Sequence, residues 1–183
     1  MLNPKDRSRA FNLALIAQET FGKIIAALFL WSLWAIVFSS LDYSFIGLII
    51  LSFISIGFGT ITPLIDFNES HATNPLWTGH ARFHLVWQVS AMILTAILSL
   101  ALLWFYFSTF NVFIVLSLNY LWIISFFMTV LSMKLYDGEL NDINGVPPVS
   151  TQIFGFKFEI DRNVQAISGI FFLNTYAFIL FLI

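Results

Sequence analysis

The chain of 183 residues contains no cysteine, and this absence excludes several kinds of chemistry at once. Disulfides, cysteine-ligated zinc, iron–sulfur clusters and thiol nucleophiles all require that residue. Charge is scarce as well, because Asp, Glu, Lys and Arg make up 10% of the residues and the formal net charge is −2. With so little charge and no basic stripe, nucleic acid is not expected as a partner.

The common sequence motifs of nucleotide and serine-hydrolase chemistry are missing too. The chain has no Walker motif, no dinucleotide-binding glycine motif and no G-x-S-x-G element. ATP use, nicotinamide cofactors and serine hydrolysis therefore have no support in the sequence. A divalent metal is the one cofactor left open, and without cysteine it would need nitrogen and oxygen ligands.

Apolar residues, by contrast, are abundant. They form 59% of the chain, and the mean hydropathy is +0.89. Five runs free of Asp, Glu, Lys and Arg each come close to the ~20 residues that span a bilayer as a helix. These runs are residues 24–41, 44–65, 85–107, 111–133 and 164–183. They predict an all-α integral membrane protein, a single five-helix transmembrane domain over residues 1–183.

The distribution of basic residues predicts an orientation. Threading the chain through five crossings places all eight Lys and Arg residues on one side. The positive-inside rule makes this side the cytoplasm. We therefore expect a cytoplasmic N-terminus, an external C-terminus and, as the membrane, the bacterial inner membrane. Residues 10–23 should form a helix that runs into the first span, because Glu19 and Lys23 make a favourable i,i+4 pair.

The polar chemistry is concentrated on the predicted cytoplasmic side. The connections near residues 41–44 and 108–111 are short, so little is exposed outside. The N-terminal segment and the loops 66–82 and 134–161 hold nine of the ten acidic residues, and all three histidines lie in the first of these loops or just after it. A functional site is therefore expected at the cytoplasmic mouth of the bundle.

The densest group of candidates begins in the first of these loops. Thr78 is a plausible N-cap, and His80, His84 and Gln88 would then follow on one helix face at spacings of four. We predict catalytic roles for four residues of this region, namely Asp66, Glu69, His80 and His84. The candidate metal ligands are His71, His80 and His84. Arg82 and Trp77 are candidate substrate-binding residues.

Three interpretations of the histidines stay open. They are hydrogen-bonded structural imidazoles at the membrane surface, ligands of a metal, or acid–base groups, since histidine titrates near neutrality. Membrane di-iron hydroxylases and desaturases also place histidines at the cytoplasmic ends of spans, but they use several histidine boxes. This chain has three histidines, so that family is disfavoured.

Polar residues inside the spans add to the predicted substrate-binding group. Gln88, Asn119 and Asn174 lie within apolar runs, where hydrocarbon offers no water to bond. We expect them to face a shared interior, either as interhelical hydrogen bonds or as the lining of a polar pocket.

The long loop 134–161 has two parts. Residues 137–145 are rich in oxygen ligands, but Asp142 stands where a calcium-binding EF-hand loop needs glycine, so a solvated turn or a carboxylate contribution to the site is expected. Residues 154–161 alternate, with Phe154, Phe156, Phe158 and Ile160 on one side and Gly155, Lys157, Glu159 and Asp161 on the other. This period predicts a short strand on the membrane surface or over the bundle, followed by Asp161 as cap of the last span.

Together these features favour a small membrane enzyme that acts on a lipophilic substrate at the histidine and carboxylate site. Acid–base isomerisation or cyclisation and metal-assisted chemistry both fit the residues. Two other classes remain, a lipid-binding or accessory subunit of a membrane complex and a small transporter or channel. The expected partners are membrane lipids and a lipophilic small molecule, and the chain could form oligomers.

Overall fold

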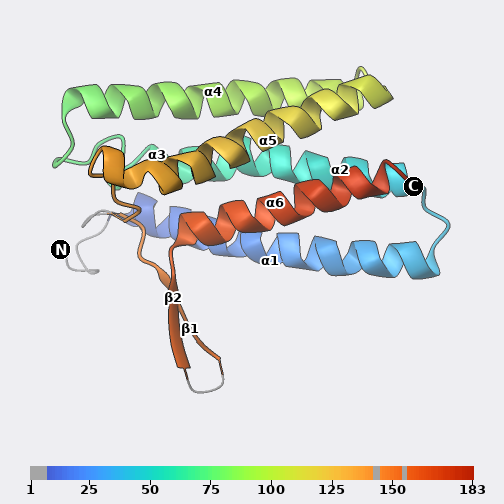
Figure 1. The fold of residues 1–183 in the computed structure, drawn as a ribbon, viewed down its shortest axis with the longest axis horizontal. Coiled ribbons are helices and arrows are strands. Elements are labelled where there is room, and N and C mark those ends of the chain that lie inside the picture. Colours follow the sequence, from blue (N-terminus) through green and yellow to red (C-terminus); the bar gives the residue numbers. More distant parts are fainter. Residues whose placement is uncertain (1–7, 142–144, 154–155) are drawn as a thin grey trace.

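The computed structural model describes residues 8–141, 145–153 and 156–183. Five helical segments are long and apolar enough to cross a membrane, which confirms the predicted all-α bundle. The elements in chain order are α1 (Arg9–Phe38), α2 (Tyr43–Ile56), the π-helical η2 (Gly57–Ile61), α3 (Thr62–Asp66), α4 (Gly79–Trp104), α5 (Thr109–Ser132), the 3-10 helix η3 (Met133–Leu135), the strands β1 (Val149–Ile153) and β2 (Phe156–Ile160), and α6 (Arg162–Leu180). The helices lie side by side along one axis (Figure 1).

The second span is the centre of the bundle. It combines α2, η2 and α3, and 56% of its most apolar stretch is buried, against 17% or 22% in each of the other four spans. Its side chains Ile46, Ile50 and Leu51 are fully buried. The other four spans surround it, and their remaining apolar surface faces outward, as expected of helices in contact with lipid.

Each long helix begins at a side-chain cap that satisfies backbone N–H groups left over at a helix start. The predicted caps Thr78 and Asp161 are confirmed, because Thr78 accepts from the N–H of Ala81 and Asp161 accepts from those of Asn163 and Val164. The remaining caps are Ser8, Asp42 and Ser108. The helix predicted over residues 10–23 is also confirmed, as the first half of α1.

A π-helical segment interrupts the second span. It lies just before Pro63, which has no N–H to donate to a preceding turn. A Cβ atom on Gly59 would lie 2.8 Å from the Cβ of Ala96 in α4, and one on Gly57 would lie 2.8 Å from the Phe21 ring in α1. The two glycines therefore allow α1 and α4 to pack closely against the second half of the second span.

A second, smaller apolar cluster lies at the N-terminal end of α1. Phe11 and Ala14 of α1 pack there with Ile65 of α3 and with Val146, which precedes the strands. This cluster holds the start of α1, the end of the second span and the long loop together. It therefore fixes the surroundings of the loop between Asp66 and Thr78, where the candidate residues gather.

The predicted strand is the second half of an antiparallel hairpin, β1–β2. Phe154 and Gly155, two residues of the predicted alternation, lie outside the described residues, as does Asp142. All five residues of β2 are exposed, and the hairpin extends away from the helices (Figure 1). The alternative that this segment covers the bundle is therefore wrong.

Candidate functional site

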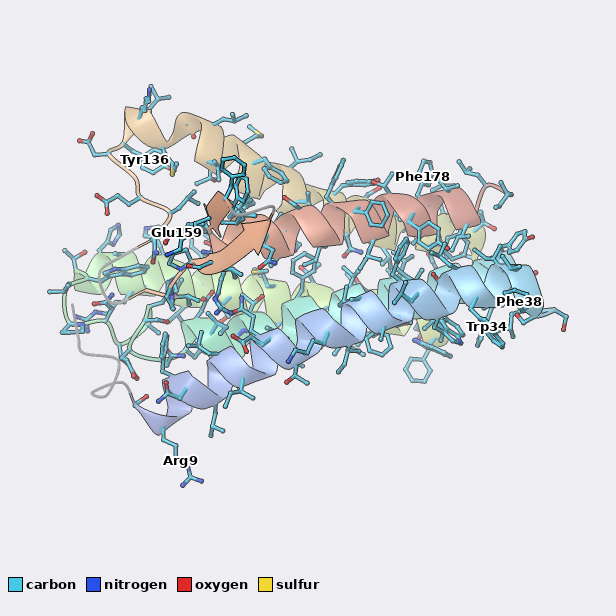
Figure 2. The ribbon with its side chains drawn as sticks, turned by 90° about the horizontal axis from the view of Figure 1, so that it is seen from below. Arg9, Trp34, Phe38, Tyr136, Glu159 and Phe178 are labelled. Atoms are coloured by element: carbon cyan, nitrogen blue, oxygen red, sulfur yellow. The ribbon has the colours of Figure 1, made fainter. Side chains whose placement is uncertain are left out.

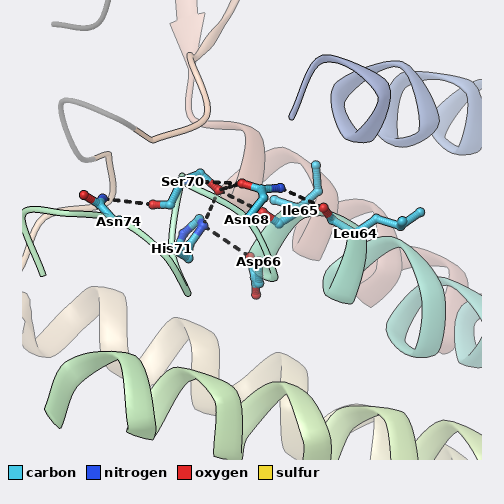
Figure 3. A network of polar contacts seen from close by, with 7 residues as sticks. All are labelled: Leu64, Ile65, Asp66, Asn68, Ser70, His71 and Asn74. Carbon is cyan, nitrogen blue, oxygen red and sulfur yellow. Dashed lines mark hydrogen bonds and ion pairs between the residues drawn. The ribbon is translucent and has the colours of Figure 1, made fainter. Parts of the chain in front are cut away.

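The loop after α3 folds around three buried polar side chains, Asn68, Ser70 and Asn74 (Figure 3). The Asn68 amide donates to the carbonyl of Leu64 at 2.8 Å, and its oxygen accepts from the N–H of Ser70 at 2.9 Å. Asn74 donates to the carbonyl of Ser70 at 3.1 Å and accepts from the N–H of Leu76 at 3.0 Å. These bonds replace regular secondary structure and give the loop one defined conformation.

His71 is attached to this network through its Nδ1 atom. Its Nδ1 lies 2.8 Å from Ser70 Oγ and 3.5 Å from Asp66 Oδ1. Ser70 Oγ also lies 2.8 Å from the carbonyl of Ile65 and 2.8 Å from Asn68 Oδ1, which are acceptors only. The hydroxyl has one proton for these neighbours, and when that proton goes to Ile65 or Asn68, Nδ1 of His71 donates to the hydroxyl oxygen.

This arrangement is not a serine–histidine–aspartate triad. A triad needs the hydroxyl on one ring nitrogen and the carboxylate on the other. Here Ser70 and Asp66 share Nδ1, and Ser70 is fully buried. The Trp77 ring packs edge-on against the imidazole, with centroids 5.3 Å apart. The geometry therefore fastens His71 in place and does not activate Ser70 as a nucleophile.

Glu69, predicted as a catalytic carboxylate, binds the start of the first helix. Its Oε1 accepts from the N–H of Ser8 at 2.7 Å, and its Oε2 accepts from the Ser8 hydroxyl at 2.6 Å. Ser8 itself caps α1 through the N–H of Phe11. Both carboxylate oxygens of Glu69 thus bind Ser8, which lies 61 positions earlier in the chain.

Arg82, predicted as a substrate-binding residue, is bonded to the loop. Its Nε and Nη2 donate to the carbonyl oxygen of Trp77 at 3.1 Å and 2.8 Å. The guanidinium therefore joins the last residues of the loop to the first turn of α4. This contact fixes the direction in which α4 leaves the loop.

The histidines His80 and His84 form a separate pair on the outer face of α4. Both side chains are exposed, their Nε2 atoms lie 3.1 Å apart, and their rings are nearly perpendicular. At this distance one Nε2 carries a proton and the other accepts it. The predicted spacing of four does bring the two rings together, although they face away from the bundle interior.

An open apolar groove of about 340 Å³ continues from this pair along α4. It is a shallow feature of α4 alone, lined by Phe83, Val86, Trp87 and Ser90. The His84 ring lies 5.6 Å from the Phe83 ring and 6.0 Å from the Trp87 ring, measured between centroids. The imidazole pair therefore lies directly beside a surface that an apolar chain can occupy.

The predicted metal shell of His71, His80 and His84 does not form. Among residues 8–141, 145–153 and 156–183, no three His, Asp or Glu side chains gather closely enough to hold a metal ion. The physical reason is orientation, because His71 is bonded within the loop while His80 and His84 face outward from α4. The predicted site is thus divided into a loop network and an outward histidine pair.

The polar residues of the spans are also divided. Asn119 of α5 donates to Asn174 of α6 at 2.9 Å, and both are buried, as predicted. Gln88 is exposed, so the expected interior shared by all three is wrong. Helix α4 packs through Val89, the next residue, and one residue turns the helix by ~100°. That rotation leaves Gln88 on the outer face with the histidine pair.

The sequence interpretation missed Ser8, Asn68 and Ser70. Asn68-x-Ser70 is a composition typical of turns in which a side chain bonds the backbone, and this local signal was present. The contact between Ser8 and Glu69 had no comparable signal, because it depends on how two distant segments meet.

A comparison of the chain with protein-family models, with curated proteins and with solved structures found no match.

Proposed function

We propose that this protein is an integral membrane enzyme that transfers a proton to or from a lipophilic substrate at the His80–His84 pair. The observation that carries the proposal is the 3.1 Å contact between two exposed imidazoles beside an apolar groove. An apolar substrate body would lie along Phe83, Val86 and Trp87, and its polar end would reach the histidines. Isomerisation and cyclisation are the reaction classes that need only such proton transfers.

The pair supplies a base and an acid in one place. In the neutral pair the two Nε2 atoms bond each other, so the ring that donates from Nε2 has its lone pair on Nδ1 and the ring that accepts at Nε2 carries an Nδ1–H. A proton can therefore be taken at one Nδ1 and delivered from the other, while the proton between the rings shifts from one Nε2 to the other. A positioned acid or base typically contributes a rate factor of about 10²–10⁴. Metal-assisted chemistry would need further ligands from water or substrate, because the described protein residues offer this pair no third His, Asp or Glu.

The loop network would act by positioning this pair. Asn74 fixes the backbone at Leu76, and the carbonyl of Trp77 receives both bonds from Arg82 in the first turn of α4. The chain of contacts therefore runs from the buried loop to the helix turn that carries His80. In this proposal Asp66, Glu69 and His71 are positioning residues and do not contact substrate.

We also propose that the site lies on the cytoplasmic side of a bacterial inner membrane, with the C-terminus outside. The support is the positive-inside rule applied to five spans. A reporter fused after Ile183 should report the outside, and a reporter inserted within 140–150 should report the cytoplasm. Opposite results at both positions would reverse the orientation and remove the cytoplasmic assignment.

Gln88 supports the second candidate, an accessory subunit of a membrane complex. It is exposed within the apolar run that begins at residue 85, where lipid offers its amide no hydrogen-bond partner. A partner helix, from another protein or a second copy, would cover it together with the histidines.

A transporter or channel is the weakest of the three classes, since the spans carry no charge at mid-membrane and the interior amides of Asn119 and Asn174 bond each other.

Deuterium exchange can test the enzyme proposal without knowledge of the substrate. The purified protein would be incubated in deuterium oxide with a total polar lipid extract of its host membrane, and the lipids analysed by mass spectrometry. Acid–base isomerisation should introduce deuterium into particular lipids, and His80→Ala and His84→Ala should abolish this incorporation. Thr95→Ala, further along α4, is the matched control and should retain it.

Two results would reject the proposal. Incorporation that persists in both histidine variants would show that the pair is not the proton-transfer site. No incorporation by the wild-type protein would favour the accessory subunit, and co-purification of a membrane partner that is lost in Gln88→Leu would then support that alternative.

A further inference from the structure

The β1–β2 hairpin has one apolar and one polar face. Strand alternation places Phe156, Phe158 and Ile160 on one face of β2 and Lys157 and Glu159 on the other. Cross-strand pairing sets Val149 opposite Ile160, so this valine shares the apolar face. The exposed fractions of Phe156, Phe158 and Ile160 are 70%, 47% and 42%, so a large part of this face is left uncovered by the described residues.

A hairpin of this kind does not hold its shape alone. An isolated two-stranded ribbon is marginally stable at best in water, and it needs a cover on its apolar face. Figure 1 shows the hairpin leaving the bundle, and Figure 2, which views the molecule from below, shows it nearly end-on. The cover must therefore come from outside the bundle.

The base of the hairpin is fixed at the point where the last span begins. Asp161 follows β2 directly and caps α6. Arg162 donates to the carbonyl of Pro147 at 2.9 Å and to Glu19 of α1 at 3.1 Å, so it ties both ends of the hairpin to the first span. Because α6 is a membrane span that starts at Arg162, the hairpin leaves the bundle at the level where the chain enters the bilayer.

The direction of the hairpin agrees with this level. The strands run across the common axis of the helices, which is the direction of the membrane plane (Figure 1). A ribbon that starts at the interface and runs along it has lipid on one side and water on the other. Its two faces have the matching composition, with aromatic and aliphatic side chains on one and Lys157 and Glu159 on the other.

We propose that the β1–β2 hairpin is an interfacial anchor whose apolar face inserts into the lipid headgroup and acyl boundary beside α6. The occupant is the bilayer surface itself, because lipid surrounds every span at this level and phenylalanine and isoleucine side chains partition into that layer. Lys157 and Glu159 remain in water. This inference is independent of the chemistry at His80 and His84.

The absence of cysteine allows a direct test with single labels. Phe158→Cys and Glu159→Cys would each carry a nitroxide label in the full-length protein, reconstituted in vesicles of equal parts phosphatidylcholine and phosphatidylglycerol. Collision with oxygen, which concentrates in lipid, and with a water-soluble nickel chelate would be measured by power saturation. The label at 158 should collide mainly with oxygen and the label at 159 mainly with nickel.

A second pair of labels, at Phe156→Cys and Lys157→Cys, repeats the comparison with Phe158 intact. This pair tests the proposal even if the hairpin needs Phe158 in order to fold. Unchanged circular dichroism and monodisperse elution serve as folding controls. Nickel access at both faces would place the hairpin in water and overturn the proposal. Low access to both reagents at 158, with dipolar broadening between labels, would mean that a second copy covers the face, and this would overturn it too.

Discussion

His71 and the His80–His84 pair are close in sequence but lie in opposite environments. His71 is bonded to Ser70 and faces Asp66 in a loop whose polar side chains are buried and mutually satisfied. His80 and His84 bond each other on an exposed helix face beside an apolar groove. The comparison shows two uses of histidine. A ring that is hydrogen-bonded within a buried loop network stabilises the fold, whereas an exposed pair on a helix surface is accessible to a ligand.

The largest expected difference is in activity. His84→Ala should reduce deuterium incorporation into the substrate lipid by about 10²–10⁴-fold, because one member of the acid–base pair is lost. Its free energy of unfolding should change by no more than about 0.5 kcal/mol, since the side chain is exposed. Activity and thermal unfolding of the same preparation would be compared. Aggregation of His80→Ala and His84→Ala, with normal specific activity in the folded fraction, would falsify the catalytic assignment.

The next effect lies in the buried loop. Asn74→Ala should lower the free energy of unfolding by about 2–3 kcal/mol, because it leaves the carbonyl of Ser70 and the N–H of Leu76 without their partner. Thr73→Ala, an exposed neighbour in the same loop, is the matched control and should be nearly neutral. Denaturation in a mild detergent would measure both. Equal stability of the two variants would mean that the loop network does not hold the fold.

A smaller effect is expected at the far end of the same network. Ser8→Ala should cost about 1 kcal/mol of stability, the usual value for a lost N-cap, and it also removes the hydroxyl donor to Glu69. Limited proteolysis should then cut earlier near the start of α1. Unchanged cleavage and stability would show that the Ser8 hydroxyl, and with it the bond to Glu69 Oε2, is not needed to hold that helix.

The smallest effect is expected in the apolar interior. Asn119→Ala should cost about 0.6 kcal/mol, the average of interhelical hydrogen bonds measured within membranes. Ser117→Ala, on the exposed face of the same helix, is the control. Thermal unfolding in detergent would compare them. A loss of activity at unchanged stability would instead favour the polar pocket over the structural contact.

The success of the sequence interpretation depended on whether a feature is local. The spans follow from apolar runs, and the caps Thr78 and Asp161 follow from residue type and position, so each could be predicted from a few neighbours. The orientation of Gln88 could not, because α4 is apolar on most sides and no single stripe marks the packed face. The contact of Ser8 with Glu69 required the tertiary fold itself.

The predicted site residues do lie near one end of the bundle, but the structure divides them into two groups. Charge distribution and histidine spacing indicated the region and the His80–His84 contact. Whether Asp66 and His71 would join them depended on the path of the loop, which Asn68, Ser70 and Asn74 determine through bonds to backbone groups. Such loop paths are set by a few hydrogen bonds and leave no periodic pattern in the sequence.

The π-helical turn at Gly57–Ile61 sets the angular phase between the two ends of the second span. A π turn accommodates one residue more than an α turn, and each residue of an α-helix advances by ~100°. If the same residues kept continuous α-helical bonding, the wide turn would no longer absorb the extra residue, and α3 would be rotated by about that angle, which would carry the Asp66 carboxylate away from His71. The length of one turn in mid-membrane thus determines the direction of a side chain at its surface.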